Sequence, residues 1–222
     1  MSEPHLKAVL WDMDGVIADT ADYHYQAWKD VFGEMGVAFS KADFVPLFGR
    51  RHDAIIRFAL GNSLSPEEEN ALSGKKQAIY RRRVSQNVIP LPGAVALIKS
   101  LNQHKIKTAI GSSAVPENID VIIRGLGIED CFQAIAYGTE VAEGKPSPQI
   151  FQLAAKKLGV KPADCVVIED AIAGVAAAKK AGMKCIAVTN SHPAQSLKNA
   201  DLIVDTLEKV DISVLSGLFQ KR

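Results

Sequence analysis

Two aspartates one residue apart follow an apolar run near the start of the chain. Residues 8–20 read AVLWDMDGVIADT, so Asp12 and Asp14 stand directly after the run AVLW. Carboxylates at such a distance repel one another, and each like-charge contact raises a pKa or calls for a cation. The pair therefore indicates either a cation site or a simple turn after an edge strand, with Gly15 in a left-handed conformation.

Other polar side chains follow apolar runs later in the sequence. Two serines follow KIKTAIG (105–111), two acids follow CVVI (165–168), and a lysine precedes a proline in EGKPSPQIF (143–151). Because ligands of a doubly wound sheet bind outside the carboxyl ends of its strands, we expect these side chains to converge at one edge with the two aspartates. The five residues are Ser112, Ser113, Lys145, Glu169 and Asp170.

Carboxylates, hydroxyls and one lysine at a single edge suit the transfer of a phosphoryl group. Mg²⁺ takes oxygen ligands and commonly uses one or two carboxylates together with substrate phosphate. A lysine beside such a cation complements the charge on the non-bridging phosphate oxygens. Asp12 could then attack phosphorus to form an aspartyl-phosphate, while Asp14 acts as general acid for the leaving oxygen and later as base.

Each of these residues also has an ordinary structural explanation. Glu169 and Asp170 could begin a helix, where acids interact favourably with the helix dipole. Ser112 and Ser113 could be N-caps, and Lys145 could be a solvated loop residue. The chemical interpretation therefore depends on the combination of these residues.

Short apolar runs alternate with helical patterns over most of the sequence. Helices are predicted at residues 93–104 (GAVALIKSLNQH) and 171–182 (AIAGVAAAKKAG), the second ending at Gly182. The alternation predicts an α/β fold, with a Rossmann-like, doubly wound parallel sheet covered by helices on both faces. The predicted strands are KAVLWD (7–12), KIKTAIGSS (105–113), CVVIED (165–170), KCIAVTN (184–190) and ADLIVD (200–205).

Residues 20–90 differ from this alternation. Helical patterns separated by Gly, Pro or Ser fill the region, and no part of it has the pattern of a strand. SPEEE (65–69) is typical of a helix start, with Ser65 as N-cap and Pro66 at the first helical position. We therefore expect a helical cap domain at residues 20–90, inserted into a core domain of residues 1–19 and 91–222.

The composition of the 222 residues is that of an ordinary globular protein, with 47% hydrophobic and 23% charged residues. A formal charge of +1 creates no field that attracts nucleic acid or an anionic membrane, so neither is expected as a partner. No signal peptide or bilayer-spanning run is predicted. The three cysteines form no CxxC pair and are predicted to be free thiols, so we expect a cytoplasmic location.

Four segments resemble, in order and spacing, the motifs of the haloacid dehalogenase superfamily. They are DMDGV (12–16), Ser112 after a strand, Lys145 before Pro146, and VIEDAIAG (167–174). ADTADYHYQAWKDVFGEMG (18–36) is similar to the first cap helix of the β-phosphoglucomutase-like subfamily, which has a small helical cap. The resemblance covers nearly the whole chain and implies a monomeric enzyme that acts on a small phosphorylated metabolite. It argues against dehalogenation, because the dehalogenases of the superfamily lack the second aspartate.

The resemblance also implies roles for individual residues. Asp12 corresponds to the nucleophile and Asp14 to the general acid and base. Ser112, with Ser113 beside it, and Lys145 correspond to residues that bind the transferring phosphate. The implied Mg²⁺ ligands are Asp12, the backbone carbonyl of Asp14, Glu169 and Asp170.

Two residues of the expected cap also match the subfamily. His24 matches a histidine near the hinge, and Lys76 matches a lysine that meets the substrate. As alternatives, His24 could be a hydrogen-bonded, half-buried helix residue, and Lys76 could lie on a solvated helix face beside the arginines of GKKQAIYRRR.

One part of the subfamily pattern is missing. A mutase needs a second phosphate site, which in β-phosphoglucomutases resembles a cap arginine and a Ser-Lys-Asn run after the serine of the second motif. Here the uncharged segment 114–116 (AVP) replaces that run. His52 stands in the place of the arginine, and Arg50 or Arg51 is the alternative contact. We therefore expect a Mg²⁺-dependent phosphatase, with a β-phosphoglucomutase and a non-catalytic metabolite sensor as the alternatives.

Overall fold

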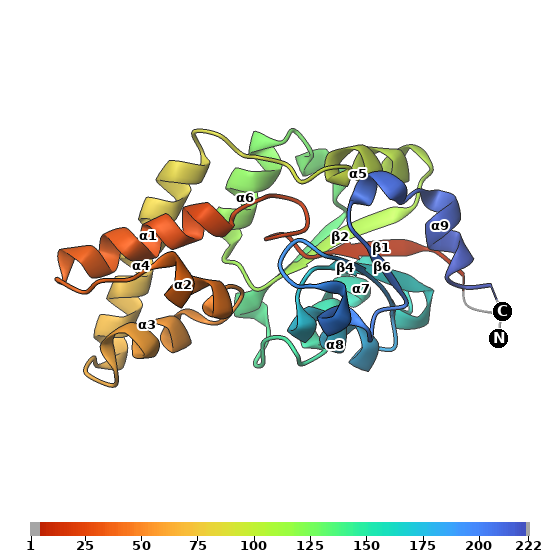
Figure 1. Cartoon of the computed structure of the whole chain (residues 1–222). Helices are drawn as coiled ribbons and strands as arrows, with labels where there is room; N and C mark the ends of the chain where they lie inside the picture. The colour runs from red at the N-terminus through yellow and green to blue at the C-terminus, as the bar shows by residue number, and fades with distance from the viewer. Residues whose placement is uncertain (1–4, 221–222) are drawn as a thin grey trace. The chain divides into compact units, whose positions relative to one another are not determined.

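The computed structural model describes residues 5–220, and its strands form a six-stranded sheet in the order β3-β2-β1-β4-β5-β6 (Figure 1). All neighbouring strands are parallel. The fold class expected from the sequence is therefore confirmed. The strands are β1 (Ala8–Trp11), β2 (Lys107–Ser112), β3 (Ala134–Tyr137), β4 (Cys165–Glu169), β5 (Lys184–Val188) and β6 (Leu202–Val204).

The strand β1 lies in the interior of the sheet, between β2 and β4. Trp11, its last residue, is opposite Ile110 on one side and Ile168 on the other. All four residues of β1 are buried, as expected for a central strand of a parallel sheet with two covered faces. The alternative of a turn after an edge strand is therefore wrong for the Asp12–Asp14 segment.

Helices cover both faces of the sheet. In Figure 1, α5 lies above the sheet and α7 and α8 lie below it. Side chains of β1 point alternately to the two faces of the sheet. Ala8 and Leu10 pack with Phe151 of α7 and Val175 of α8. Val9 and Trp11 therefore face the other side. The helices of this part are α5 (Ala94–Gln103), α6 (Pro116–Gly125), α7 (Gln149–Leu158), α8 (Ile172–Lys180) and α9 (Ile212–Gly217). Short 3₁₀ turns occur at Glu129–Cys131, Gly138–Glu140, Pro162–Asp164, Ala194–Leu197 and Leu207–Lys209.

The strand β3 is missing from the sequence-based prediction. It is short, lies at the edge of the sheet and has three half-buried residues out of four, so it lacks a long apolar run. The five predicted strands correspond to β1, β2, β4, β5 and β6. The predicted helix at 171–182 corresponds to α8, which is followed by Gly182 at a φ of 74°.

The chain divides into two compact units, and the second contains Thr20–Val88. The first unit contains the described residues up to Asp19 and those from Ile89 onward, whereas the sequence-based division places the second boundary after residue 90. The regular secondary structure of the second unit is helical. Its helices are α1 (Ala21–Glu34), α2 (Lys41–Phe44), α3 (His52–Leu60) and α4 (Pro66–Val84), with a 3₁₀ turn at Val45–Leu47.

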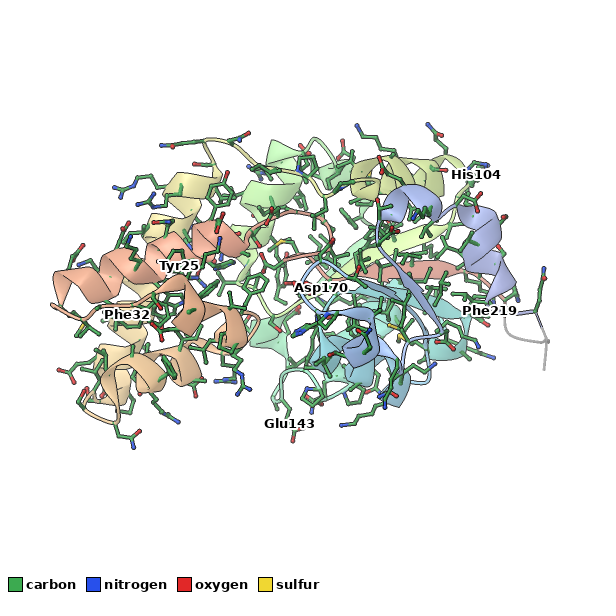
Figure 2. The ribbon with its side chains drawn as sticks, viewed as in Figure 1. Tyr25, Phe32, His104, Glu143, Asp170 and Phe219 are labelled. Atoms are coloured by element: carbon green, nitrogen blue, oxygen red, sulfur yellow. The ribbon has the colours of Figure 1, made fainter. Side chains whose placement is uncertain are left out.

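The helical unit has an aromatic core of its own. Tyr25 and Phe32 belong to this core and lie on α1 (Figure 2). At the start of α4, the Ser65 hydroxyl accepts a hydrogen bond from the backbone of Glu68, so Ser65 is the predicted N-cap. The Glu68 side chain in turn accepts a hydrogen bond from the Ser65 backbone, which completes a capping box. Within residues 5–220, none of the helices is long and apolar enough to cross a membrane.

Candidate active site

The polar residues at the carboxyl ends of β1, β2 and β4 lie at one edge of the sheet. The Asp12 backbone N–H donates to the Ile168 carbonyl at 3.0 Å, which extends the pairing of β1 with β4 by one residue. Asp170 directly follows β4 and is buried at this edge (Figure 2). The buried polar residues of this edge are Asp12, Ser112, Glu169 and Asp170.

The segment after β1 is a tight loop that returns toward its own start. The Gly15 N–H donates to the Ala18 carbonyl at 3.0 Å, and the Ile17 N–H donates to the Met13 carbonyl at 2.9 Å. Gly15 has a φ of 81°, and a Cβ at this position would lie 2.8 Å from Asp170 Cγ. Glycine is required here both for its backbone conformation and for the close approach of Asp170. The loop holds Asp14, which is half-buried, one residue beyond the buried Met13.

Lys145 joins two of the carboxylates. Its ammonium donates to Asp12 Oδ1 at 2.7 Å and to Glu169 Oε1 at 2.6 Å, and only 10% of its side chain is exposed. Lys145 Nζ also lies 4.8 Å from the centre of the Phe151 ring. The alternative of a solvated loop lysine is therefore wrong.

Burial is the main influence on the pKa values of the two aspartates of this cluster. It raises the pKa of Asp12 to about 7, although the nearby Lys145 charge opposes the shift. Burial also raises the pKa of Asp170 well above its ordinary value, with Glu169 and Asp12 adding to the effect. For Lys145, burial alone would lower the pKa, but the charges of Asp12 and Glu169 raise it above the ordinary value.

Three carboxylates of the cluster can hold a cation together. Asp12, Glu169 and Asp170 each offer one oxygen, and these oxygens all lie within 4.8 Å of one another. Only oxygen donors are involved, which is the donor set that hard divalent cations prefer. A bound cation would also relieve the mutual repulsion that contributes to the raised pKa values.

The two serines at the end of β2 differ in their surroundings. Ser112 is buried, and its hydroxyl oxygen accepts a hydrogen bond from the Ala114 N–H at 3.1 Å. This bond closes a short turn and leaves the Ser112 O–H available as a donor. The alternative that the two serines are N-caps is wrong, because the N-cap of the following helix α6 is Val115. Ser113 is exposed.

Two residues of the same edge are missing from the sequence-based prediction. The Ser191 hydroxyl donates to Asp170 Oδ2, and Asn190 Nδ2 donates to the Gly15 carbonyl at 2.9 Å. Both follow β5, the neighbour of β4 in the sheet. The strand-end rule applied to KCIAVTN could have identified them, because that predicted strand ends in Asn190.

The helical unit contains a second polar cluster. His24 Nδ1 lies 2.6 Å from Lys76 Nζ, and the His24 ring stacks on Tyr80 with the ring centres 4.0 Å apart. Lys76 is only 1% exposed, and its Nζ lies 5.4 Å from the centre of the Trp28 ring. The alternative of a solvated helix face is therefore wrong for Lys76, whereas His24 is both half-buried and hydrogen-bonded.

His52 belongs to this second cluster. Its ring meets the Trp28 ring edge-on, with the centres 5.2 Å apart. Burial lowers the pKa of His52 to about 3, and the charges of Lys76 and His24 contribute, so the imidazole is neutral near pH 7. Arg51 is exposed, and its Nε lies 3.4 Å from the Asp53 carboxylate.

Comparison with known proteins agrees with this architecture. The family model of haloacid dehalogenase-like hydrolases matches residues 6–182. A β-phosphoglucomutase of Bacillus subtilis is 36% identical over 218 residues, which cover 95% of this chain and 94% of the relative. A fructose-1-phosphate phosphatase of Escherichia coli is 31% identical over 180 residues, covering 81% of this chain and 95% of that protein.

A solved structure extends the similarity to three dimensions. The crystal structure of β-phosphoglucomutase from Clostridium difficile has a TM-score of 0.85 and 30% sequence identity, and the match covers 96% of this chain and 97% of that one. The expected resemblance to the β-phosphoglucomutase-like subfamily is thus confirmed. The chain is a phosphoryl-transfer enzyme that belongs to the haloacid dehalogenase-like hydrolase family.

Proposed function

We propose that the protein is a Mg²⁺-dependent phosphatase that hydrolyses a small phosphorylated metabolite, a sugar phosphate, through an aspartyl-phosphate. The observation that carries this proposal is the buried Asp12 carboxylate, which accepts a hydrogen bond from Lys145 and lies beside Glu169 and Asp170. A carboxylate held in this way at a strand end is placed to act as a nucleophile.

The proposed reaction has two displacements at phosphorus. In the first, an Asp12 oxygen forms a bond to phosphorus as the bond to the leaving oxygen breaks, and Asp14 gives that oxygen a proton. In the second, Asp14 takes a proton from water, whose oxygen bonds to phosphorus as the Asp12–phosphorus bond breaks. The Lys145 ammonium and the Ser112 hydroxyl stabilise the negative phosphoryl oxygens in both steps.

The same edge fits Mg²⁺. Asp12, Glu169 and Asp170 would hold the ion, together with the backbone carbonyl of Asp14 that the family resemblance implies. When bound, Mg²⁺ supplies positive charge for the non-bridging phosphate oxygens.

Two places in the chain favour hydrolysis over isomerisation, one in the helical unit and one in the segment after β2. A mutase must bind a second phosphate group, and the residue in place of the expected arginine is the neutral His52, held against Trp28. Segment 114–116 also offers no charged side chain. A β-phosphoglucomutase is the second candidate function, supported by the contact of His24 with the buried Lys76 and by the nearly full-length match to such an enzyme.

Phosphate release from a panel of sugar monophosphates tests the proposal. Wild-type protein with Mg²⁺ should release phosphate steadily, and Asp12→Asn should abolish the release. The matched control is Asp205→Asn, because Asp205 is an exposed aspartate paired with Lys209, and this variant should remain active. Release that survives in Asp12→Asn would contradict the assignment of the nucleophile.

A ³¹P NMR time course separates the two candidate functions. The protein is incubated with Mg²⁺ and β-glucose 1-phosphate, primed with a trace of the 1,6-bisphosphate. Inorganic phosphate alone supports the phosphatase, whereas a glucose 6-phosphate signal that grows ahead of inorganic phosphate supports the mutase.

We further propose that the enzyme acts as a monomer in the cytoplasm, on a small molecule rather than on nucleic acid or membrane lipid. The formal charge of +1 supports this choice of substrate. Light scattering coupled to size-exclusion chromatography tests the monomer directly.

A further inference from the structure

The loop that follows β5 contacts two separate segments of the candidate active site. The Thr189 N–H donates to the Val204 carbonyl at 3.0 Å, so the loop begins from a fixed point beside β6. Asn190 then donates to the Gly15 carbonyl at 2.9 Å, and Ser191 donates to Asp170 Oδ2. The loop therefore connects the segment after β1 to the segment after β4.

The three segments meet at Gly15. A Cβ at this position would lie 2.8 Å from Asp170 Cγ and 3.0 Å from Ser191 Oγ. Gly15, the Asp170 carboxylate and the Ser191 hydroxyl are therefore packed closely together, which leaves the Asp170 side chain little room to rotate. Asp170 is only 2% exposed, so water offers it little alternative hydrogen bonding.

A hydroxyl bonded to a carboxylate affects how that carboxylate binds a cation. The hydrogen bond fixes the rotation of the carboxylate and stabilises its ionised form, so its other lone pairs point in constant directions. The Asn190 bond acts on a different part of the edge. It fixes the Gly15 carbonyl and thereby the loop of residues 12–18, which contains Asp12 and Asp14.

We propose that Ser191 and Asn190 are positioning residues for the cation site, Ser191 by orienting Asp170 and Asn190 by holding the Asp12–Ala18 loop beside it. The proposal rests on the proposed function only in naming Mg²⁺ as the cation. Ser191 bonds to a proposed ligand of the ion and Asn190 to the loop beside it, so their substitution should change the affinity for the ion.

Isothermal titration of the substrate-free protein with Mg²⁺ tests the proposal. Ser191→Ala should raise the dissociation constant of Mg²⁺ about tenfold or more, the range that outer-sphere partners of metal ligands show. Ser191→Thr retains the hydroxyl and should restore most of the affinity. Asn190→Ala should weaken binding several-fold, and its exposed position limits any effect on folding.

Matched controls lie a few residues further along the chain. Ser196→Ala and Asn199→Ala change exposed residues of the same types and should leave the affinity for Mg²⁺ unchanged. If Ser191→Ala and Asn190→Ala bind Mg²⁺ like the wild type, the positioning role is wrong and the proposed function is unaffected. If the wild-type protein itself does not bind Mg²⁺, the proposed cofactor fails, and the inference fails with it.

Discussion

Each of the two units contains ionisable side chains whose pKa values are shifted by burial and by neighbouring charges. Asp12 and Asp170 have raised pKa values because burial disfavours their charged forms, while Lys145 forms ion pairs with Asp12 and Glu169. His52 shows the opposite case for a base, because burial lowers its pKa to about 3. The charge state of such residues depends on folding, so it links stability to pH.

The first prediction concerns the pKa of His52. Burial and the charges of Lys76 and His24 lower this pKa, and the charge of Asp53 opposes the shift. In the unfolded chain this histidine binds a proton below about pH 6.5, whereas in the folded protein it does so only near pH 3. The unfolded state therefore binds more protons between these values, and stability should fall as the pH falls through this window. Between pH 7 and pH 5, His52 should account for a loss of about 1–2 kcal/mol in the free energy of unfolding.

Urea unfolding at both pH values, without added metal, measures this loss. His52→Phe keeps an aromatic ring against Trp28 and removes the titrating group, so its free energy of unfolding should change less between pH 7 and pH 5. The same change with pH in wild type and variant would contradict the assignment.

At the scale of the elements, the sheet order brings the chemistry together. Because β1 lies between β2 and β4 in matched register, the residues after these three strands lie side by side. The backbone of α8 also lies close to this edge, because a Cβ at Gly174 would overlap the carboxylate of Glu169. The helix following β4 must therefore carry a glycine at this position for Glu169 to reach Lys145.

The second prediction compares two helical glycines. Gly74→Ala on α4 should stabilise the protein by about 0.5–1 kcal/mol, because a Cβ there meets no atom within 4 Å and alanine favours a helix. Gly174→Ala has the same gain in helix propensity but displaces Glu169, so it should destabilise the protein and lower phosphate release. Urea unfolding and the activity assay measure both variants, and a stabilised, fully active Gly174→Ala would refute this explanation.

At the scale of the whole molecule, each unit has its own hydrophobic core. One core packs the sheet against α7 and α8, and the other packs the aromatic residues of the helical unit. The cluster of Asp12, Glu169 and Asp170 belongs to the sheet unit alone. A cation bound there would stabilise this unit, because the unfolded chain does not bring the three carboxylates together.

The third prediction is that Mg²⁺ raises the melting temperature. At a concentration of 100 times the dissociation constant, a ligand that binds only the folded state adds about 2.7 kcal/mol to the free energy of unfolding. Chelation should reverse the shift and stop phosphate release, and added Mg²⁺ should restore both. Asp170→Asn should show a much smaller shift in a thermal melt; an equal shift in this variant would mean that the ion binds elsewhere.

Local patterns in the sequence were sufficient for much of the fold and of the candidate site. The alternation of apolar runs and helical patterns predicted the parallel sheet. The period of the hydrophobic residues and the length of each run can be read from neighbouring residues alone. The same logic found Asp12, Lys145, Glu169 and Asp170, because each lies next to a recognisable strand end or within a family motif. It missed β3, a four-residue edge strand that is only partly buried and whose Ala134 and Ala136 pack with residues of α7.

The sequence by itself determined the fold class and the family, and it named candidate residues for phosphoryl transfer. Only the tertiary structure decided which residues touch: that Lys145 joins Asp12 to Glu169, that Ser191 bonds to Asp170, and that Lys76 is buried against His24. The physical reason is that these contacts join residues far apart in the chain. The order of the strands and the packing of the helices bring such residues together, and a local sequence pattern does not reveal these contacts.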